Sequence, residues 1–201
     1  MGSLRDPDAA LMLRVQRGDT RAFEELMARY EQSVANLLYR SLGDATEAED
    51  IAQNVFLQVY KSAGRYRVSA KFSTWLYTIA RNLCLNELRR RTRHPAVSLD
   101  APHPEHDDEA SRSLPDRQVA GPVESTLHAE LEAKIQEALN DLPETQRTAI
   151  LLCREQELSY EDIAAVLGCS LTAVKSLIHR GRETLKRRLK PYLRTGEWPG
   201  P

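Results

Sequence analysis

Aromatic residues are scarce in this chain, at 6% of its 201 residues, and strand-like alternation of apolar and polar residues is hard to find. The chain also lacks a run of about 18 apolar residues, so we expect no direct membrane insertion. Its first residues, MGSLRDPDAA, lack the apolar core of a signal peptide. Together with 41% hydrophobic and 28% charged residues, these absences predict an all-α globular protein of the cytoplasm.

Residue patterns that mark metal sites and enzymes are absent too. The five histidines and three cysteines show no HxxxH or CxxC spacing, so no metal site and no cofactor are expected. The sequence shows no Gly-rich phosphate loop, no Ser/His/Asp arrangement and no paired carboxylates in an apolar setting, so we do not expect an enzyme. Cys84, Cys153 and Cys169 are predicted to be small buried hydrophobic residues in a reducing cytoplasm.

What the chain does have is a helix-turn-helix pattern over residues 159–189. Ser159 and Asp162 resemble a capping box that begins one helix, and Gly168 suits the left-handed conformation that ends it. Ser170 is placed to cap a second, longer helix. Two helices joined by so short a turn are typical of DNA-binding proteins whose second helix enters the major groove.

The predicted second helix is strongly basic. Between residues 171 and 194, eight basic residues stand against one acidic residue, Glu183. Neutralising DNA phosphates needs such an excess, whereas an ordinary solvated helix mixes the two signs. The alternative interpretation is a terminal amphipathic helix that is basic for solubility.

Four helices are predicted before residue 94, because apolar residues recur there at steps of three and four. The predicted ranges are 9–17, 20–42, 46–62 and 73–93. Ser73 or Thr74 is expected to cap the fourth helix. The third helix carries an acidic and polar face, which either is an ordinary solvated surface near the positive end of the helix dipole or docks a basic or polar partner.

A basic and aromatic stretch follows the third helix. Residues 61–93 hold nine basic residues and one acidic residue, and Tyr66, Trp75 and Tyr77 lie among them. Rings on which bases stack, beside cations that follow the backbone, suit single-stranded nucleic acid. Phe72 is predicted to be core, whereas Trp75 is equally compatible with the core and with an exposed stacking position.

A change of composition divides the chain in two. Residues 95–124 contain five prolines and an acidic run, which predict a flexible acidic linker without a core. A less favoured interpretation has this acidity screen the neighbouring basic surfaces or lie in a basic channel of a partner. Residues 125–140 and 145–154 are predicted to be helical, so that 125–201 forms a four-helix domain with the helix-turn-helix. We therefore expect two small helical domains, residues 1–94 and 125–201.

Long motifs in this chain resemble the extracytoplasmic-function sigma factors, the small two-domain group of bacterial sigma factors. The matching stretches are AFEELMARYEQSVANLLYR, EDIAQNVFLQVY, FSTWLYTIARNLCLNELRRR, LNDLPETQRTAILLCREQELSYEDIAAVLGCS and AVKSLIHRGRETLKRRL. They cover most of residues 22–91 and 139–189, in the family's order and spacing. The resemblance implies that residues 1–94 are sigma region 2 and that residues 125–201 are sigma region 4.

The resemblance also implies three binding surfaces. Core RNA polymerase is expected to bind Asp50, Gln53, Asn54 and Phe56. The non-template strand of the opened −10 element is expected to contact Lys61, Arg65, Lys71, Trp75, Arg81 and Asn82. The −35 duplex is expected to contact Ser170, Lys175, Ser176, His179, Arg180 and Arg182. Asn82 stands where the family hydrogen-bonds a flipped base.

Two residues depart from the family's pattern. Leu177 stands where Arg is frequent, which puts one DNA contact in question. Gly181 stands where Ala is usual, and glycine inside a helix is expected to loosen the recognition helix by up to about 1 kcal/mol.

The function implied is that of a sigma factor, which directs core polymerase to specific promoters in a stress or envelope response and is held inactive by an anti-sigma factor. One alternative is a stand-alone helix-turn-helix regulator with an N-terminal effector or dimerisation domain, which would bind duplex DNA alone. Another is a helical interaction protein whose basic faces bind an acidic protein. Affinity for core polymerase separates the first hypothesis from the second.

Overall fold

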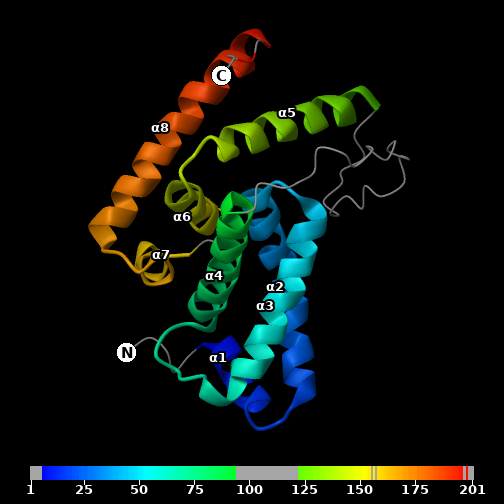
Figure 1. The fold of residues 1–201 in the computed structure, drawn as a ribbon, viewed down its shortest axis with the longest axis vertical. Coiled ribbons are helices and arrows are strands. Elements are labelled where there is room, and N and C mark those ends of the chain that lie inside the picture. Colours follow the sequence, from blue (N-terminus) through cyan, green and yellow to red (C-terminus); the bar gives the residue numbers. More distant parts are fainter. Residues whose placement is uncertain (1–5, 94–121, 155, 157, 197, 199–201) are drawn as a thin grey trace.

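The computed structural model describes residues 6–93, 122–154, 156, 158–196 and 198, and these form eight α-helices and one 3-10 turn without a strand (Figure 1). The elements are α1 (Pro7–Val15), α2 (Thr20–Leu42), α3 (Ala45–Ser62), the turn η2 (Ala63–Arg65), α4 (Phe72–Arg93), α5 (Pro122–Asn140), α6 (Glu144–Arg154), α7 (Tyr160–Leu167) and α8 (Leu171–Thr195). The all-α prediction is confirmed. Residues 94–121, most of the expected linker, lie outside the described residues, and α5 begins at Pro122 rather than at residue 125.

Short-range signals in the sequence set most helix ends. The carboxylate of Asp19 accepts a hydrogen bond from the backbone N–H of Ala22 at 3.2 Å and so begins α2. Gly43, with φ +72°, ends that helix in the left-handed conformation. These are capping arrangements that a few neighbouring residues can specify.

The start of α4 is different, because its cap comes from the other end of the domain. Asp6 accepts hydrogen bonds from the N–H of Asp8 at 3.0 Å and from the N–H of Phe72 at 2.8 Å, so one carboxylate serves both α1 and α4. The prediction that Ser73 or Thr74 caps α4 is wrong. Both residues lie inside the helix.

Helices α1 to α4 form the N-terminal domain around a core rich in aromatic side chains. Phe72 is 1% exposed, as predicted, and it packs against Tyr30, Tyr66 and Trp75 at centroid distances of 5.4 to 6.3 Å. Tyr66 and Tyr77 are each 2% exposed. Neither of these two rings offers the stacking surface that the sequence suggested, because both are used to fill the core.

Helices α5 to α8 form the C-terminal domain, in which α7 and α8 make the predicted helix-turn-helix. Ser159 caps α7, Gly168 ends it with φ +64°, and Ser170 caps α8. No single described helix combines the length and the apolar composition needed to cross a membrane; α7 and α8 reach that threshold only when taken together, across a bend of 97°.

The two domains pack side by side. In Figure 1 the short helix α7 lies against α4, and α6 lies beside the upper ends of α2 and α4. Buried apolar residues of both domains, such as Leu37 of α2 and Leu152 of α6, belong to one continuous core. The C-terminal domain therefore rests directly on α4, the helix that carries three of the predicted −10 residues, Trp75, Arg81 and Asn82.

Candidate nucleic-acid interface

The predicted −35 residues lie on an open surface of the helix-turn-helix. Ser170 accepts a hydrogen bond from the N–H of Ala173 at 3.1 Å, which fixes the start of α8. The inward face of α8 is held by three buried residues, Val174, Ile178 and Gly181. The side chains that remain exposed are those of Lys175, Ser176, His179, Arg180 and Arg182.

Gly181 lies where α8 approaches α6 most tightly. A Cβ built on Gly181 would overlap the Cδ1 atom of Ile150 and lie 3.3 Å from its Cγ1 atom and 3.5 Å from the Cβ of Gln146. The expectation that Gly181 merely loosens the recognition helix is therefore incomplete. Because Gly181 has no side chain, α8 can pack directly against the buried Ile150. Glycine at this position therefore allows the close approach of the two helices, although it lowers the helix propensity of α8.

The basic residues beyond residue 186 are not all turned toward a DNA-binding face. Arg188 forms an ion pair with Asp141 at 2.6 Å, and its guanidinium lies 5.4 Å from the ring centroid of Trp198. The indole N–H of Trp198 donates to Glu137 at 2.6 Å, and this bond, with help from Lys134, holds the pKa of Glu137 below its ordinary value. Trp198 thereby joins α8 to α5, a contact that no local sequence pattern predicts.

The predicted −10 residues divide into an open group and a covered group. Lys61, Arg65 and Asn82 are exposed. Arg81, by contrast, is mostly buried and pairs with Glu144 of α6, with Nε to Oε1 at 3.3 Å. Trp75 is half-buried, its ring 4.9 Å from that of Tyr66, so it lies at the edge of the aromatic core.

Asp162 is the main polar link between α7 and α4, and sequence reasoning gave it only a capping role. Its carboxylate accepts hydrogen bonds from Lys71 Nζ at 2.8 Å, from Thr74 Oγ1 at 3.1 Å and from Ser159 Oγ at 2.6 Å. Partial burial alone would raise the pKa of Asp162, but these hydrogen bonds outweigh it and hold the pKa below its ordinary value. The charged carboxylate is thus the stable form in the packed molecule.

The predicted polymerase-binding residues lie on α3. Asp50, Gln53 and Asn54 are exposed, at helical spacings that place them on one face. Phe56 is only 5% exposed, so its ring is mainly part of the core. It lies at the base of an open groove of about 580 Å³ between α2 and α3, whose lining includes Glu31 and Gln53.

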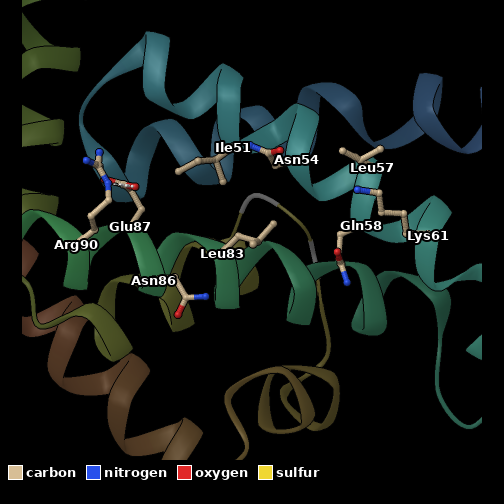
Figure 2. Close-up of a pocket in the computed structure, with 9 residues that line it drawn as sticks. All are labelled: Ile51, Asn54, Leu57, Gln58, Lys61, Leu83, Asn86, Glu87 and Arg90. Carbon is tan, nitrogen blue, oxygen red and sulfur yellow. Dashed lines mark hydrogen bonds and ion pairs between the residues drawn. The ribbon is translucent and has the colours of Figure 1, made fainter.

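A second groove, of about 360 Å³, lies between α3 and α4 (Figure 2). Asn54, Leu57 and Lys61 line it from α3, and Asn86 lies on its α4 side. Leu57 is 48% exposed, which is high for a large apolar residue. The predicted −10 residue Lys61 and the predicted polymerase-binding residue Asn54 line the same groove, so the two predicted surfaces meet there.

The three cysteines differ in burial. Cys84 is buried, and this burial raises the pKa of its thiol to about 11. Cys153 and Cys169 are half-buried and pack against the core, so the prediction that they are buried is only partly right for these two. Within the described ranges, no three His, Cys, Asp or Glu side chains come together in a way that would hold a metal ion.

Comparisons with known families match both domains. The family described as Sigma-70 region 2 matches residues 26–94, and Sigma-70 region 4 matches residues 132–185. The all-helical fold, the exposed basic helix-turn-helix and these two matches define a bacterial transcription-initiation factor. Such factors are not enzymes, and their regions 2 and 4 bind core RNA polymerase and promoter DNA.

Individual relatives cover nearly the whole chain. The RNA polymerase sigma-H factor of Pseudomonas aeruginosa is 39% identical over 190 residues, which are 94% of this chain and 97% of the relative. The ECF RNA polymerase sigma-E factor of Haemophilus influenzae is 36% identical over 187 residues, 92% of this chain and 97% of the relative. The chain belongs to the extracytoplasmic-function sigma factors, as the sequence motifs predicted.

A solved relative has the same fold. The sigma factor RpoE of Bartonella quintana, crystallised with the anti-sigma factor NepR, matches with a TM-score of 0.62 and 26% identity. The match covers 84% of this chain and 96% of the solved chain. The arrangement of helices is therefore that of a sigma factor in both domains.

Proposed function

We propose that this chain carries core RNA polymerase to a promoter by gripping two separate DNA elements with its two domains. Residues 1–94 would act as region 2 on the −10 element and residues 125–201 as region 4 on the −35 element, with residues 95–124 as the linker. One observation carries the proposal: each of the two family matches contains its own candidate DNA-binding surface. The region 4 match contains the exposed basic surface of α8, and the region 2 match contains the aromatic and basic residues of α4.

For the −35 element, we assign the contacts to the exposed side of α8. Lys175 and His179 are four residues apart, as are Ser176 and Arg180, so these two neighbouring rows together make up the exposed side of the helix. Arg180 can read a guanine with two hydrogen bonds, and Ser176 can bond either a base or a phosphate. Ser170 and Arg182 lie toward the flanks, where phosphate contacts are expected.

For the −10 element, we assign the contacts to α4 and the segment before it. Trp75 and Asn82 are seven residues apart along α4, which places the ring edge and the amide on the same side of the helix. Flipping a base costs a few kcal/mol, and a site that both stacks on the base and hydrogen-bonds it offsets that cost. Lys61, Arg65 and Lys71 supply cations for the backbone of the unpaired strand, and Arg81 joins them when it is released from Glu144.

For core polymerase, we assign the exposed face of α3. Asp50 supplies negative charge there, and Gln53 and Asn54 supply amides, a combination that suits a basic or polar helical partner and fast electrostatic encounter. Phe56 would be touched only by a partner side chain that enters the groove between α2 and α3. We therefore assign Phe56 to shaping this groove rather than to an exposed contact with polymerase.

An anti-sigma factor is a further partner that we propose for this chain. The supporting observation is that the relative RpoE was solved in complex with the anti-sigma factor NepR and matches both domains. Control of this kind fits a cytoplasmic sigma factor that responds to a stress or envelope signal.

Transcription with purified core polymerase tests the proposal. Core enzyme and fragmented genomic DNA of the source bacterium are incubated with or without the chain, and RNA 5′ ends are mapped. We expect a small set of start sites that depend on the chain. A chain that binds duplex DNA but confers no start-site selection would instead support the stand-alone regulator.

A further inference from the structure

We propose that the free chain is autoinhibited at its −10 surface but not at its −35 surface, because the C-terminal domain forms ion pairs with Lys71 and Arg81 while leaving the outer face of α8 open. The proposal rests on the −10 role assigned to α4 above. It goes further in stating that single-stranded DNA and the C-terminal domain compete for the same residues.

The first contact that closes the molecule is centred on Asp162. Its two carboxylate oxygens accept hydrogen bonds from Lys71 Nζ at 2.8 Å and from Thr74 Oγ1 at 3.1 Å. Lys71 is one of the cations assigned to the −10 strand. While its ammonium group is paired with Asp162, part of its positive charge is already neutralised, which weakens its attraction for a phosphate of the strand.

A second ion pair engages Arg81, another of the cations assigned to the −10 strand. The guanidinium pairs with Glu144 of α6 at 3.3 Å, and both side chains are largely buried. Between these two ion pairs, the hydroxyl of Tyr77 donates to Gln156, whose amide in turn donates to the backbone oxygen of Ser33 at 3.3 Å. The C-terminal domain thus contacts α4 from its start to about its middle.

The −35 surface is not involved in this closure. Lys175, His179 and Arg180 are exposed, and α8 packs mainly against α5, α6 and α7. The closed chain is therefore expected to bind duplex DNA through α8 while two of its single-strand cations, Lys71 and Arg81, are held by the C-terminal domain. This asymmetry distinguishes the proposal from a general masking of DNA-binding charge.

Some of the polar contacts that hold the closed form are exposed or incompletely satisfied. Lys71 is 57% exposed, and exposed ion pairs contribute little to stability. Arg147 donates to the backbone oxygen of Ser41 across the interface, yet its Nε is buried without a partner in the described part of the chain. An unpaired buried donor is costly, so the interface is imperfect and a binding partner can separate the domains.

Cys84 provides a native reporter of opening. It is buried, and it lines a narrow cavity between the domains together with Ser41 of α2 and Glu144 and Thr148 of α6. Separation of the domains removes α6 from one side of the thiol. Alkylation of Cys84 should therefore become faster whenever the molecule opens.

The test uses the full chain with Asp162→Lys, which places a cation opposite Lys71. Glu161→Lys is the matched control: it makes the same charge change in the first turn of the same helix, at an exposed residue. Iodoacetamide labelling of Cys84 at pH 8, read by peptide mass spectrometry, reports opening. Fluorescein-labelled random 20-mers, single-stranded and duplex, report binding.

We expect Asp162→Lys to raise both the alkylation rate of Cys84 and the affinity for single-stranded DNA about tenfold relative to Glu161→Lys. The affinity for duplex DNA should be equal in the two variants.

If Cys84 alkylates faster while single-strand affinity stays equal and measurable, the autoinhibition is refuted and the −10 role of α4 stands. If Cys84 alkylates faster and no variant binds the strand, the −10 role itself fails. Unchanged alkylation refutes closure through Asp162. Should Asp162→Lys lose its helical circular dichroism, Asp162→Asn replaces it, with smaller changes expected in the same directions.

Discussion

Replacing Gly181 by alanine separates two opposing effects of one methyl group. In an ordinary helix interior, Gly→Ala stabilises by up to about 1 kcal/mol. Here the added Cβ would overlap the Cδ1 atom of Ile150, in a buried contact between α8 and α6. Overpacking of this kind costs about 1–3 kcal/mol, so Gly181→Ala should lower the free energy of unfolding by up to about 2 kcal/mol.

A double-mutant cycle with Ile150→Val isolates the contact, because valine lacks the Cδ1 atom. In that background Gly181→Ala should stabilise by up to about 1 kcal/mol, giving a coupling of about 1–3 kcal/mol. Urea unfolding followed by helical circular dichroism measures all four proteins. Gly64→Ala, at a position with no atom within 4 Å of the new Cβ, should change stability by less than about 0.5 kcal/mol. Equal effects of Gly181→Ala in both backgrounds would refute the close approach of the helices.

Four further predictions follow from particular contacts. Asp6→Ala should lower the free energy of unfolding by about 2 kcal/mol in urea titrations, since it removes the cap of α1 and that of α4; a loss below about 0.5 kcal/mol would contradict the double cap. Arg180→Ala should cost about 1–3 kcal/mol in anisotropy titrations of a promoter duplex, and an equal loss on random duplex would make it a phosphate contact. Asp50→Arg should weaken core polymerase binding about tenfold or more in pull-down titrations and leave duplex binding unchanged; loss of both would count against the assigned surfaces. The hydrogen-bond partners of Asp162 lower its pKa, so its contribution to closure is present above about pH 4 and is lost as the pH falls through that lowered pKa. Small-angle scattering should therefore show that the molecule expands in acid, and Asp162→Asn should reduce this expansion.

The elements that sequence reasoning predicted well depend on neighbouring residues. Ser159, Gly168 and Ser170 specify the helix-turn-helix within a dozen positions, and all three behave as expected. The inner stripes of α2 and α3 follow from apolar spacing alone. Family membership was also predictable, because long motifs occur in a fixed order.

What the sequence could not show depends on residues far apart in the chain. Asp6 caps α4 across 66 positions, and no local rule favours it over Ser73. Asp162 was recognisable as a helix-capping residue, but its bonds to Lys71 and Thr74 exist only because the domains pack together. Burial is equally non-local: neither composition nor spacing tells that Tyr77 fills the core while Trp75 reaches its edge.

The central claim is that the two domains hold different parts of one promoter and that the part on α4 is single-stranded. Permanganate probing of unpaired thymines, combined with nuclease footprinting, tests this on a promoter bound by core polymerase and the chain. We predict reactive thymines near −10 together with protection near −35, and with Asn82→Ala we predict loss of the reactive thymines and intact −35 protection. Undiminished thymine reactivity with Asn82→Ala, or loss of both signals together, would contradict the account.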